Sequence, residues 1–365
     1  MPEYVRHASL ILVMDGEYQN FVVACQVETH PVSRLWWLLP EKVPAGSVRI
    51  FELKTGRTDK WPFMEIRMDS SGLEVGRGIA RALRYNYGVI PPPDSSSGLY
   101  SRSGFIHPIW TPRGTVLTRI HPSDHIHHMG FWNPWTKAIF EGQQVDFWNL
   151  GEGEGTVRFV RFLDVQIGPV FGSFQVLHDH VVFKQNGREK VALKEIWHVK
   201  VWNLNQIPGK IWIWDFTTAQ WCATDKPLRI LKYRYGGFGF RGTAEWNEKN
   251  SAYLTSEGKT RVDGNGTRAR WCMISGQTNN GVAGIAFFSH PENHEHPEPM
   301  RIWPRGDVFF GFCPVVYADW ELKPGKNYIR KYRVVVFDGK MSAQEVETLW
   351  QAFAHPPNMQ IEWLK

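Results

Sequence analysis

Two apolar runs joined by an Asn-Gly pair decide the fold of this chain: Phe174-Gln-Val-Leu-His-Asp-His-Val-Val-Phe-Lys184, Asn186-Gly187 and Glu189-Lys-Val-Ala-Leu-Lys-Glu-Ile-Trp-His-Val-Lys-Val-Trp-Asn203. Both runs are rich in β-branched and aromatic residues, which favour extended backbone. The Asn-Gly pair suits a type I′ turn, whose twist matches that of two antiparallel strands. The stretch therefore predicts a long β-hairpin.

Short strand-like segments recur on both sides of this hairpin. On the N-terminal side we expect strands over 8–14 and 20–27, around a turn at Asp15-Gly16-Glu17, and over Val48–Leu53, Met64–Met68, Gly78–Tyr87, Ile139–Trp148 and Val157–Ile167. Phe105–Leu117 is expected to form two strands around a turn at Pro112-Arg113-Gly114. On the C-terminal side we expect them over Ile211–Thr218, Gly236–Arg241, Arg268–Ile274, Gly284–Ser289, Val308–Tyr317 and Tyr328–Phe337. The series shows no helix between strands and no repeat of 20–50 residues. It predicts an all-β fold, either a large antiparallel β-sandwich or a closed β architecture.

One helix is expected, at the C-terminal end. Ser342-Ala-Gln-Glu345 is a capping box, and Val346, Leu349, Trp350 and Phe353 then fall on one helical face before Pro356-Pro357. We expect a single domain over residues 1–365, with residues 1–95 as a smaller N-terminal β subregion.

The composition narrows the class of function. Aromatic residues make up 14% of the chain, and 18 residues are Trp. Indole rings pack in protein cores and also serve as platforms on which the C–H faces of sugars stack. The net charge of +6 is scattered rather than gathered in a run, which argues against nucleic-acid binding and is compatible with an anionic substrate such as a uronic acid.

The four cysteines, which lie far apart, are expected to be buried free thiols. No run of 18 apolar residues and no basic-then-apolar leader is seen, so we expect no membrane span and a cytoplasmic location. A secreted protein whose signal had been removed would give the same sequence.

Chemistry is expected in the stretch His121-Pro-Ser-Asp-His-Ile-His-His-Met-Gly-Phe-Trp132, which holds four of the fourteen histidines. If the stretch is extended, His125 and His127 share one face and His128 takes the other. His121, His125 and His127 would then hold a divalent metal ion. Acid–base work, hydrogen bonding to a ligand and a purely structural role remain as alternatives.

A second histidine cluster, His290-Pro-Glu-Asn-His-Glu-His296, is followed by Arg301 and Trp303. Its Pro and Glu content is typical of a solvated loop, yet two loops at one end of a sandwich can meet to form a site.

Two carboxylates and one arginine complete the candidates. Asp146 lies in an expected apolar strand, and Glu195 shares a strand face with Trp197. If these carboxylates have a structural role, we expect each to be buried and paired with an arginine. If they have a functional role, burial raises their pKa to a range suited to acid–base catalysis. Arg241 follows Tyr235-Gly-Gly-Phe-Gly-Phe240, whose glycines allow close backbone approach to a carboxylate of the protein or of a ligand.

Read together, five segments resemble the bacterial and fungal PmoA-like family, labelled methane oxygenase and known from sugar-utilisation contexts. They are Arg102-Ser-Gly-Phe-Ile-His107-Pro108, His121–Trp132, Val145-Asp-Phe-Trp148, Tyr235–Arg241 and His290–Trp303. The resemblance covers roughly residues 80–355.

A weaker likeness is to galactose-mutarotase-like supersandwich proteins, through His128-Met-Gly-Phe-Trp132 and Leu322-Lys-Pro-Gly325. It implies a β-supersandwich in which histidine acids and a carboxylate base act on sugar oxygens. The four-histidine cluster departs from the mutarotase pattern.

The preferred interpretation is a carbohydrate-active enzyme, of the glycoside hydrolase, lyase or epimerase kind, that cleaves or rearranges a small or oligomeric glycoside. Its expected catalytic residues are His127, His128, Asp146 and Glu195, with a histidine as acid and a carboxylate as base. Its expected substrate-binding residues are His107, His121, Trp132, Trp148, Arg241, His290, Arg301 and Trp303. A metal-dependent enzyme or oxygenase and a non-catalytic sugar-binding protein are the alternatives.

Overall fold

The long hairpin forms as the sequence predicts. In the computed structural model, which describes residues 8–13, 21–29, 32–39, 44, 46–55, 61–93, 96–184, 186–204 and 211–362, strand β14 (Phe171–Phe183) pairs antiparallel with β15 (Glu189–Trp202). Gly187 in the turn has a φ of 74°, a left-handed conformation that glycine adopts without strain.

This hairpin belongs to a sheet that we call the hairpin sheet, with eight strands among the described residues in the order β13-β14-β15-β16-β25-β21-β20-β19. All neighbouring pairs are antiparallel. The other members are β13 (Gly155–Gln166), β16 (Ile211–Cys222), β19 (Ser251–Thr255), β20 (Trp271–Thr278), β21 (Gly281–Ser289) and β25 (Tyr328–Asp338).

A second sheet, called the facing sheet, also has eight strands in the described part of the chain. Its order is β22-β23-β18-β10-β9-β8-β7-β6, again antiparallel throughout. The strands are β6 (Glu65–Met68), β7 (Gly72–Arg77), β8 (Ala80–Asn86), β9 (Phe105–Ile109), β10 (Phe131–Trp132), β18 (Gly239–Arg241), β22 (Met300–Ile302) and β23 (Phe309–Phe312).

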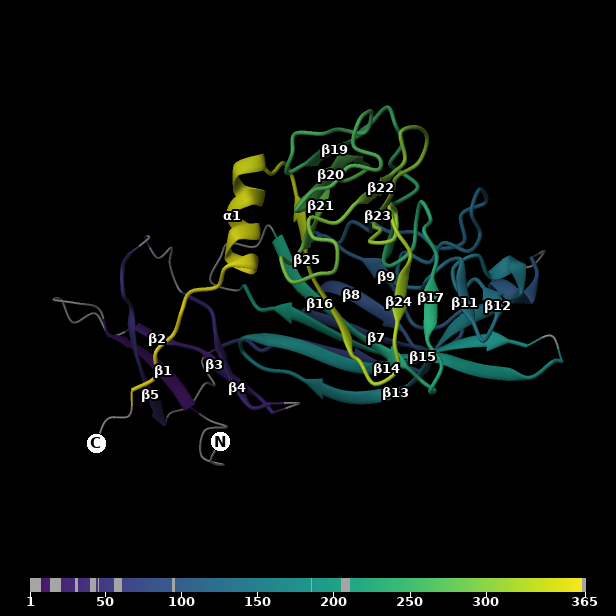
Figure 1. Ribbon diagram of the computed structural model, residues 1–365. Helices are drawn as coiled ribbons and strands as arrows, with labels where there is room; N and C mark the ends of the chain where they lie inside the picture. Colours follow the sequence, from purple (N-terminus) through teal and green to yellow (C-terminus); the bar gives the residue numbers. More distant parts are fainter. Residues whose placement is uncertain are drawn as a thin grey trace.

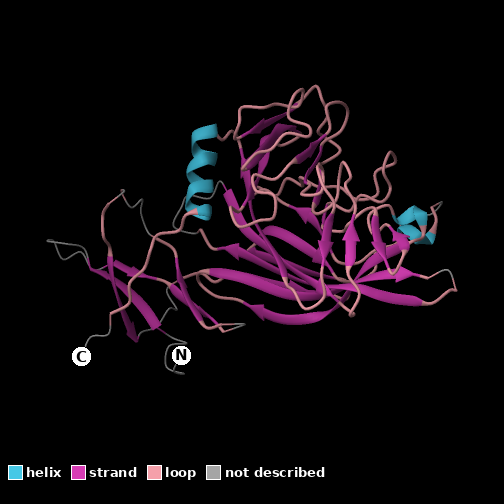
Figure 2. Ribbon diagram, viewed as in Figure 1, coloured by secondary structure: helices cyan, strands magenta, loops and turns pink. Residues whose placement is uncertain are grey.

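The main core lies between the two sheets, because its buried side chains come from strands of both. Figures 1 and 2 show the course of these strands. Phe131 of β10 meets Trp214 and Phe216 of β16, with ring centroids 5.4 Å and 5.0 Å apart. Phe240 of β18 meets Phe287 of β21 at 5.0 Å. Each such side chain contributes about 1.5–3 kcal/mol by leaving water, so the aromatic excess is largely core.

Smaller sheets flank the sandwich. One has the order β12-β11-β17-β24, another β2-β1-β5, and β3 pairs with β4. In Figure 1, β1, β2 and β5 lie to one side of the sandwich, near the marked chain ends. Their bounds are β1 (Ala8–Val13), β2 (Phe21–Val23), β3 (Cys25–Glu28), β4 (Arg34–Trp37), β5 (Ile50–Thr55), β11 (Ala138–Phe140), β12 (Gln143–Val145), β17 (Leu228–Ile230) and β24 (Trp320–Leu322).

Helix α1 (Ala343–Ala354) follows the expected capping box. The Ser342 hydroxyl accepts from the Glu345 backbone N–H, and the Glu345 carboxylate accepts from the Ser342 backbone N–H. Val346 and Trp350 are buried against the outer side of β21 and β25. Two 3₁₀ turns, η2 (Gly98–Tyr100) and η3 (Leu150–Glu152), complete the described elements.

The all-β sandwich with a C-terminal helix is therefore confirmed. The N-terminal strands pair as expected, while their turn at Asp15-Gly16-Glu17 lies outside the described residues. The expected strand Ile139–Trp148 is wrong: the chain turns at Glu141-Gly142, and β11 pairs with β12. All four cysteines are buried thiols outside any disulfide, as expected. Within the described ranges, we find no helix long and apolar enough to cross a membrane.

Candidate active site

The histidine stretch folds into two successive turns rather than a strand. The His125 N–H donates to Pro122 O at 3.1 Å, and the His128 N–H donates to His125 O at 2.9 Å. The His121 N–H closes the loop by donating to His128 O at 3.0 Å. The expected alternation is therefore wrong, because it required an extended backbone.

The turns bring three imidazoles together instead of dividing them between two faces. The His125 and His128 rings stack with centroids 4.9 Å apart, and His127 lies 4.8 Å from His128 and 5.7 Å from His125. His128 is also stacked on Phe309, at 5.1 Å.

The loop lies over the outer surface of the facing sheet, where strand periodicity has already gathered aromatic and basic residues. In β10, Phe131 points into the main core and Trp132 points outward, and in β23 Phe310 points inward and Phe309 outward. In β22, Met300 and Ile302 point inward, which leaves Arg301 outside. The outward residues form the base of a pocket.

This pocket is small and opens to solvent: its cavity volume is about 70 Å³, below the ~300–1,000 Å³ of sites that enclose a whole ligand. Its walls come from the histidine loop, the segment after β12, the segment before β18, and β22 and β23. The lining residues are His125, His127, His128, Trp148, Arg234, Tyr235, Arg301, Trp303 and Phe309.

Burial favours the neutral imidazoles of His127 and His128 at pH 7. Burial lowers the pKa of His127 to about 4, with a further contribution from the charge of His125. Burial also holds the pKa of His128 well below its usual range. The His128 Nδ1 atom is buried and meets no hydrogen-bond partner among the residues that the structure describes. Both rings can accept hydrogen bonds from a ligand hydroxyl.

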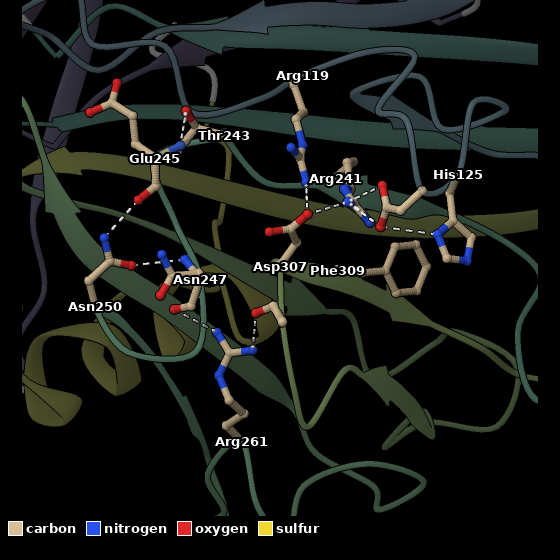
Figure 3. A network of polar contacts seen from close by, with 12 residues as sticks. Arg119, His125, Arg241, Thr243, Glu245, Asn247, Asn250, Arg261, Asp307 and Phe309 are labelled. Carbon is tan, nitrogen blue, oxygen red and sulfur yellow. Dashed lines mark hydrogen bonds and ion pairs between the residues drawn. The ribbon is translucent and has the colours of Figure 1, made fainter.

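Arg241 anchors the loop and does not point a free guanidinium at a ligand. Its Nη2 donates to both carboxylate oxygens of Asp124 at 2.7 Å and to Asp307 at 2.8 Å. Asp307 in turn pairs with Arg119, and Asp124 accepts from His125 Nδ1 at 3.1 Å. Figure 3 shows this line of polar contacts from Arg119 to His125. Arg241 was expected to bind a ligand carboxylate, but it forms buried ion pairs within the protein instead, since both carboxylates come from the chain itself.

Asp146 supports the opposite wall of the pocket. It follows β12 in a turn rather than lying in a strand, and its Oδ1 accepts the backbone N–H groups of Trp148 and Asn149, both at 2.7 Å. Its Oδ2 accepts from Thr136 Oγ1 and from the Asn149 amide. Tyr235 donates its O–H to Asn149 Oδ1 at 3.1 Å, and burial raises the pKa of Tyr235 to about 12. Asp146 is therefore saturated with protein donors, and it orients Trp148 and Tyr235.

Glu195 lies in the sandwich interior and does not line the pocket. It accepts from Asn133, Thr218, Gln220 and His180, the last at 2.9 Å. Burial raises the pKa of this carboxyl, but the hydrogen bond and charge of His180 outweigh it and lower the pKa to about 2. The geometry makes Glu195 an ionised centre of a buried hydrogen-bond network, because donors from β14, from β16 and from Asn133 after β10 surround it.

His107, His121 and Trp132 lie behind the pocket. The His107 Nδ1 bonds Thr118 Oγ1 at 2.9 Å, and His121 Nδ1–H donates to Ile126 O at 2.9 Å. Trp132 is buried under Trp148 at 4.8 Å. In the described ranges, no group of three or more His, Cys, Asp or Glu side chains is arranged to hold a metal ion. The expected set of His121, His125 and His127 is not assembled, because His121 turns away into the loop backbone.

The second histidine cluster does not reach the pocket. The His290 ring packs on Phe353 of α1 at 5.1 Å, and His294 stacks on Trp320 at 4.1 Å. The expected meeting of two histidine loops is wrong, since this loop is held by α1 and β24. The same segment reaches the pocket further along the chain, with Arg301 and Trp303.

The structure brings together His127, His128, Trp148, Arg301 and Trp303 from the predicted set, with His125 from the predicted metal set. It adds Arg234, Tyr235 and Phe309, which sequence reasoning missed. Arg234 and Tyr235 directly precede the Gly236-Gly237 pair, and that position was the available signal. Phe309 carried no signal, because it is one of several phenylalanines in a core-like run.

The chain has only distant likenesses among solved structures. They include a heparan sulfate lyase from Pedobacter heparinus (TM-score 0.34, 8% identity, 74% of this chain and 34% of that one). They also include a galactose mutarotase related enzyme from Lactobacillus acidophilus (TM-score 0.33, 9% identity, 75% and 97%) and a heparinase III gene product (TM-score 0.35, 8% identity, 80% and 38%). The chain spans about a third of the lyase. At these TM-scores the likenesses carry no argument about activity.

No curated protein matches the sequence. A family model does, over residues 73–351, which is more than half of the chain and includes every residue that lines the pocket. The likeness to PmoA-like proteins stays a prediction, because the matching description names no activity. The chain thus belongs to DUF6807, a family of unknown function.

Proposed function

We propose that this protein is a carbohydrate-active enzyme and that the pocket under the histidine loop binds one sugar ring. The observation that carries the proposal is the lining itself, in which three imidazoles stand beside Trp148, Tyr235, Trp303 and Phe309 in one open pocket. Aromatic faces stack on the C–H face of a pyranose, while imidazole and phenol groups bond its hydroxyls from the side.

The proposed chemistry is proton transfer between His127 and Tyr235 through the bound sugar. His127, with its pKa near 4, is neutral and accepts a proton, which replaces the acid role expected for it. Tyr235 keeps its proton up to a pKa of about 12 and donates it. General acid–base catalysis by positioned side chains contributes up to about 10²–10⁴-fold in rate, and most when their pKa values lie near the working pH.

The lining also favours one reaction class over another. Hydrolysis by the common two-carboxylate route needs a pair of Asp or Glu side chains that flank the glycosidic bond. Among the described residues, none of the pocket-lining side chains is a carboxylate, because Asp146 and Glu195 lie behind the walls. We therefore propose elimination or epimerisation at a sugar carbon rather than two-carboxylate hydrolysis.

The test is turnover of a panel of glycosides and oligosaccharides, followed by proton NMR, with wild type, His127→Asn and the matched control His355→Asn, whose residue is exposed beyond α1. We expect His127→Asn to lose about 10²–10⁴-fold in kcat/KM with an unchanged Tm, and the control to keep full activity. Full activity of His127→Asn would overturn the assignment. Sugar binding without turnover in wild type would instead make the protein a sugar-binding module.

A further inference from the structure

Two arginines in the pocket have no carboxylate partner. Arg301 Nη1 donates to the amide oxygen of Asn265 at 3.1 Å, and its Nε is buried without a hydrogen-bond partner in the part of the chain that the structure describes. Arg234 is exposed at the rim, and its contacts there are with the rings of Tyr233 and Tyr235, 5.5 Å and 5.8 Å from its guanidinium carbon. Neither forms an ion pair with a described residue.

Two other arginines of this chain that are buried or partly buried bind carboxylates. Arg241 holds Asp124 and Asp307, and Arg333 of β25 holds Asp215 of β16 through two bonds of 2.6 Å and 2.9 Å. Among the described residues that line the pocket, every ionisable side chain is histidine, arginine or tyrosine, so the two arginines bring positive charge with no carboxylate in the lining.

The two positive charges of the pocket are close enough to repel each other, and a bound anion would offset this repulsion. Burial lowers the pKa of Arg301, and the nearby charge of Arg234 lowers it further. Two guanidinium groups at one pocket therefore repel each other until an opposite charge lies between them.

The geometry of Arg301 indicates what kind of anion fits. Because Asn265 takes Nη1, the donors left over are Nε and Nη2, which point in parallel along one edge of the planar group. Two parallel N–H donors match the two oxygens of a carboxylate in a bidentate pair. Lysine or a single hydroxyl donor would not impose this shape.

We propose that the sugar bound in this pocket is an acidic one, a uronate whose carboxylate pairs with Arg301 and Arg234. The inference rests on the proposed function, since it takes the pocket to be a sugar site. The ring lies against Trp148 and Trp303, and the carboxylate lies toward the two arginines. Of the residues expected to bind substrate, Arg301 thus becomes the one that selects the substrate class.

Calorimetric titration of the full chain tests this with four probes: glucuronate, galacturonate, glucose and glucose 6-sulfate. The variants are Arg234→Gln, Arg301→Gln and the matched control Arg305→Gln, which removes an exposed charge close in sequence but outside the pocket lining. We expect a uronate to bind wild type at least tenfold more tightly than glucose. We expect each pocket variant to lose about 10- to 100-fold in uronate affinity, and the control to lose none.

If Arg301→Gln proves unstable, Arg301→Lys takes its place, because lysine keeps the positive charge. Arg301→Lys should still lose about tenfold in uronate affinity, since lysine lacks the second parallel donor. Equal affinity for uronate and glucose, or a uronate affinity unchanged in Arg234→Gln and Arg301→Lys, overturns the inference. Tighter binding of the sulfated sugar than of either uronate also overturns the carboxylate assignment. If the protein turns over neutral sugars and a carboxylate on the sugar does not increase the affinity, the proposed enzyme activity holds and the uronate inference fails. If uronate binding depends on the two arginines but no sugar is turned over, the uronate inference holds and the proposed enzyme activity fails.

Discussion

Gly239 is the residue at which the backbone of β18 comes closest to two indole rings. A Cβ atom added there would lie 2.4 Å from Trp148 Cη2 and 3.1 Å from Trp132 Cζ2. The first distance is shorter than any real contact, so one ring must move. The sequence indicated only that the glycines after Tyr235 allow close approach. The structure shows that the approaching groups are Trp148 of the pocket wall and Trp132 behind it.

Gly239→Ala should therefore disturb the pocket wall while leaving the sandwich folded. We expect a loss of about 1–3 kcal/mol in the free energy of unfolding from overpacking, together with a change in near-UV circular dichroism as Trp148 moves. Sugar affinity should fall because Trp148 lines the pocket. Gly98→Ala is the matched control, since an added Cβ there meets nothing within 4 Å. An alanine variant with unchanged stability and spectrum would contradict the packing argument.

At the scale of elements, the pocket depends on short strands that alternate between core and site. The facing sheet places Phe131, Phe240 and Phe310 in the main core. The neighbouring residue in each strand then points outward, which supplies Trp132, Arg241 and Phe309. The histidine loop is held over this surface by Arg241, whose guanidinium also lies 4.8 Å above the ring of Trp303. One buried arginine thus joins the loop, β18 and the segment before β23.

Arg241→Met should release the histidine loop. The change leaves Asp124 and Asp307 without their shared partner, and because both carboxylates are partly exposed we expect a loss of about 2–3 kcal/mol, toward the low end for a buried pair. Hydrogen exchange of the backbone amides of His125 and His128 should become faster, since these amides close the two turns. Unfolding in urea and exchange mass spectrometry measure the two effects.

Arg333→Met provides the comparison for that variant. It removes an arginine paired with Asp215 in the hairpin sheet, distant in sequence and structure from the loop. We expect a comparable loss of stability with no change in exchange at His125 and His128. Equal loosening of the loop in both variants would show that Arg241 has no special role there.

At the scale of the whole molecule, the sequence predicted the fold better than the site. Strand periodicity, the Asn186-Gly187 turn and the Ser342–Glu345 capping box are local signals, and local physics sufficed for them. The pocket joins residues 125 and 309, which no local pattern connects. His290 and Asp146 carried the right chemistry for a site, yet one packs on α1 and the other is saturated by its own turn. Backbone turns and helix docking decided those outcomes.

Acid stability is the property in which the buried histidines act together. Burial lowers the pKa of His107, His127 and His198 to about 4 and that of His178 to about 3. In the unfolded chain these imidazoles bind a proton near pH 6.5. Between pH 6.5 and pH 4 the unfolded state therefore binds more protons than the folded state, so the free energy of unfolding falls as the pH falls through this range.

Each of these histidines adds at most about 1.4 kcal/mol per pH unit to that slope, so the protein should lose most of its stability by about pH 5. Urea unfolding at pH 7.5, 6.5, 5.5 and 5.0 measures the slope. His127→Asn removes one of the groups that bind a proton in the unfolded chain only. The free energy of unfolding of this variant should therefore fall less steeply with pH than that of wild type. His355→Asn should match wild type, since that ring is exposed. A free energy of unfolding that stays flat from pH 7 to pH 5 would mean that the imidazoles are already solvated in the folded protein, and the neutral His127 on which the proposed proton transfer depends would have to be abandoned.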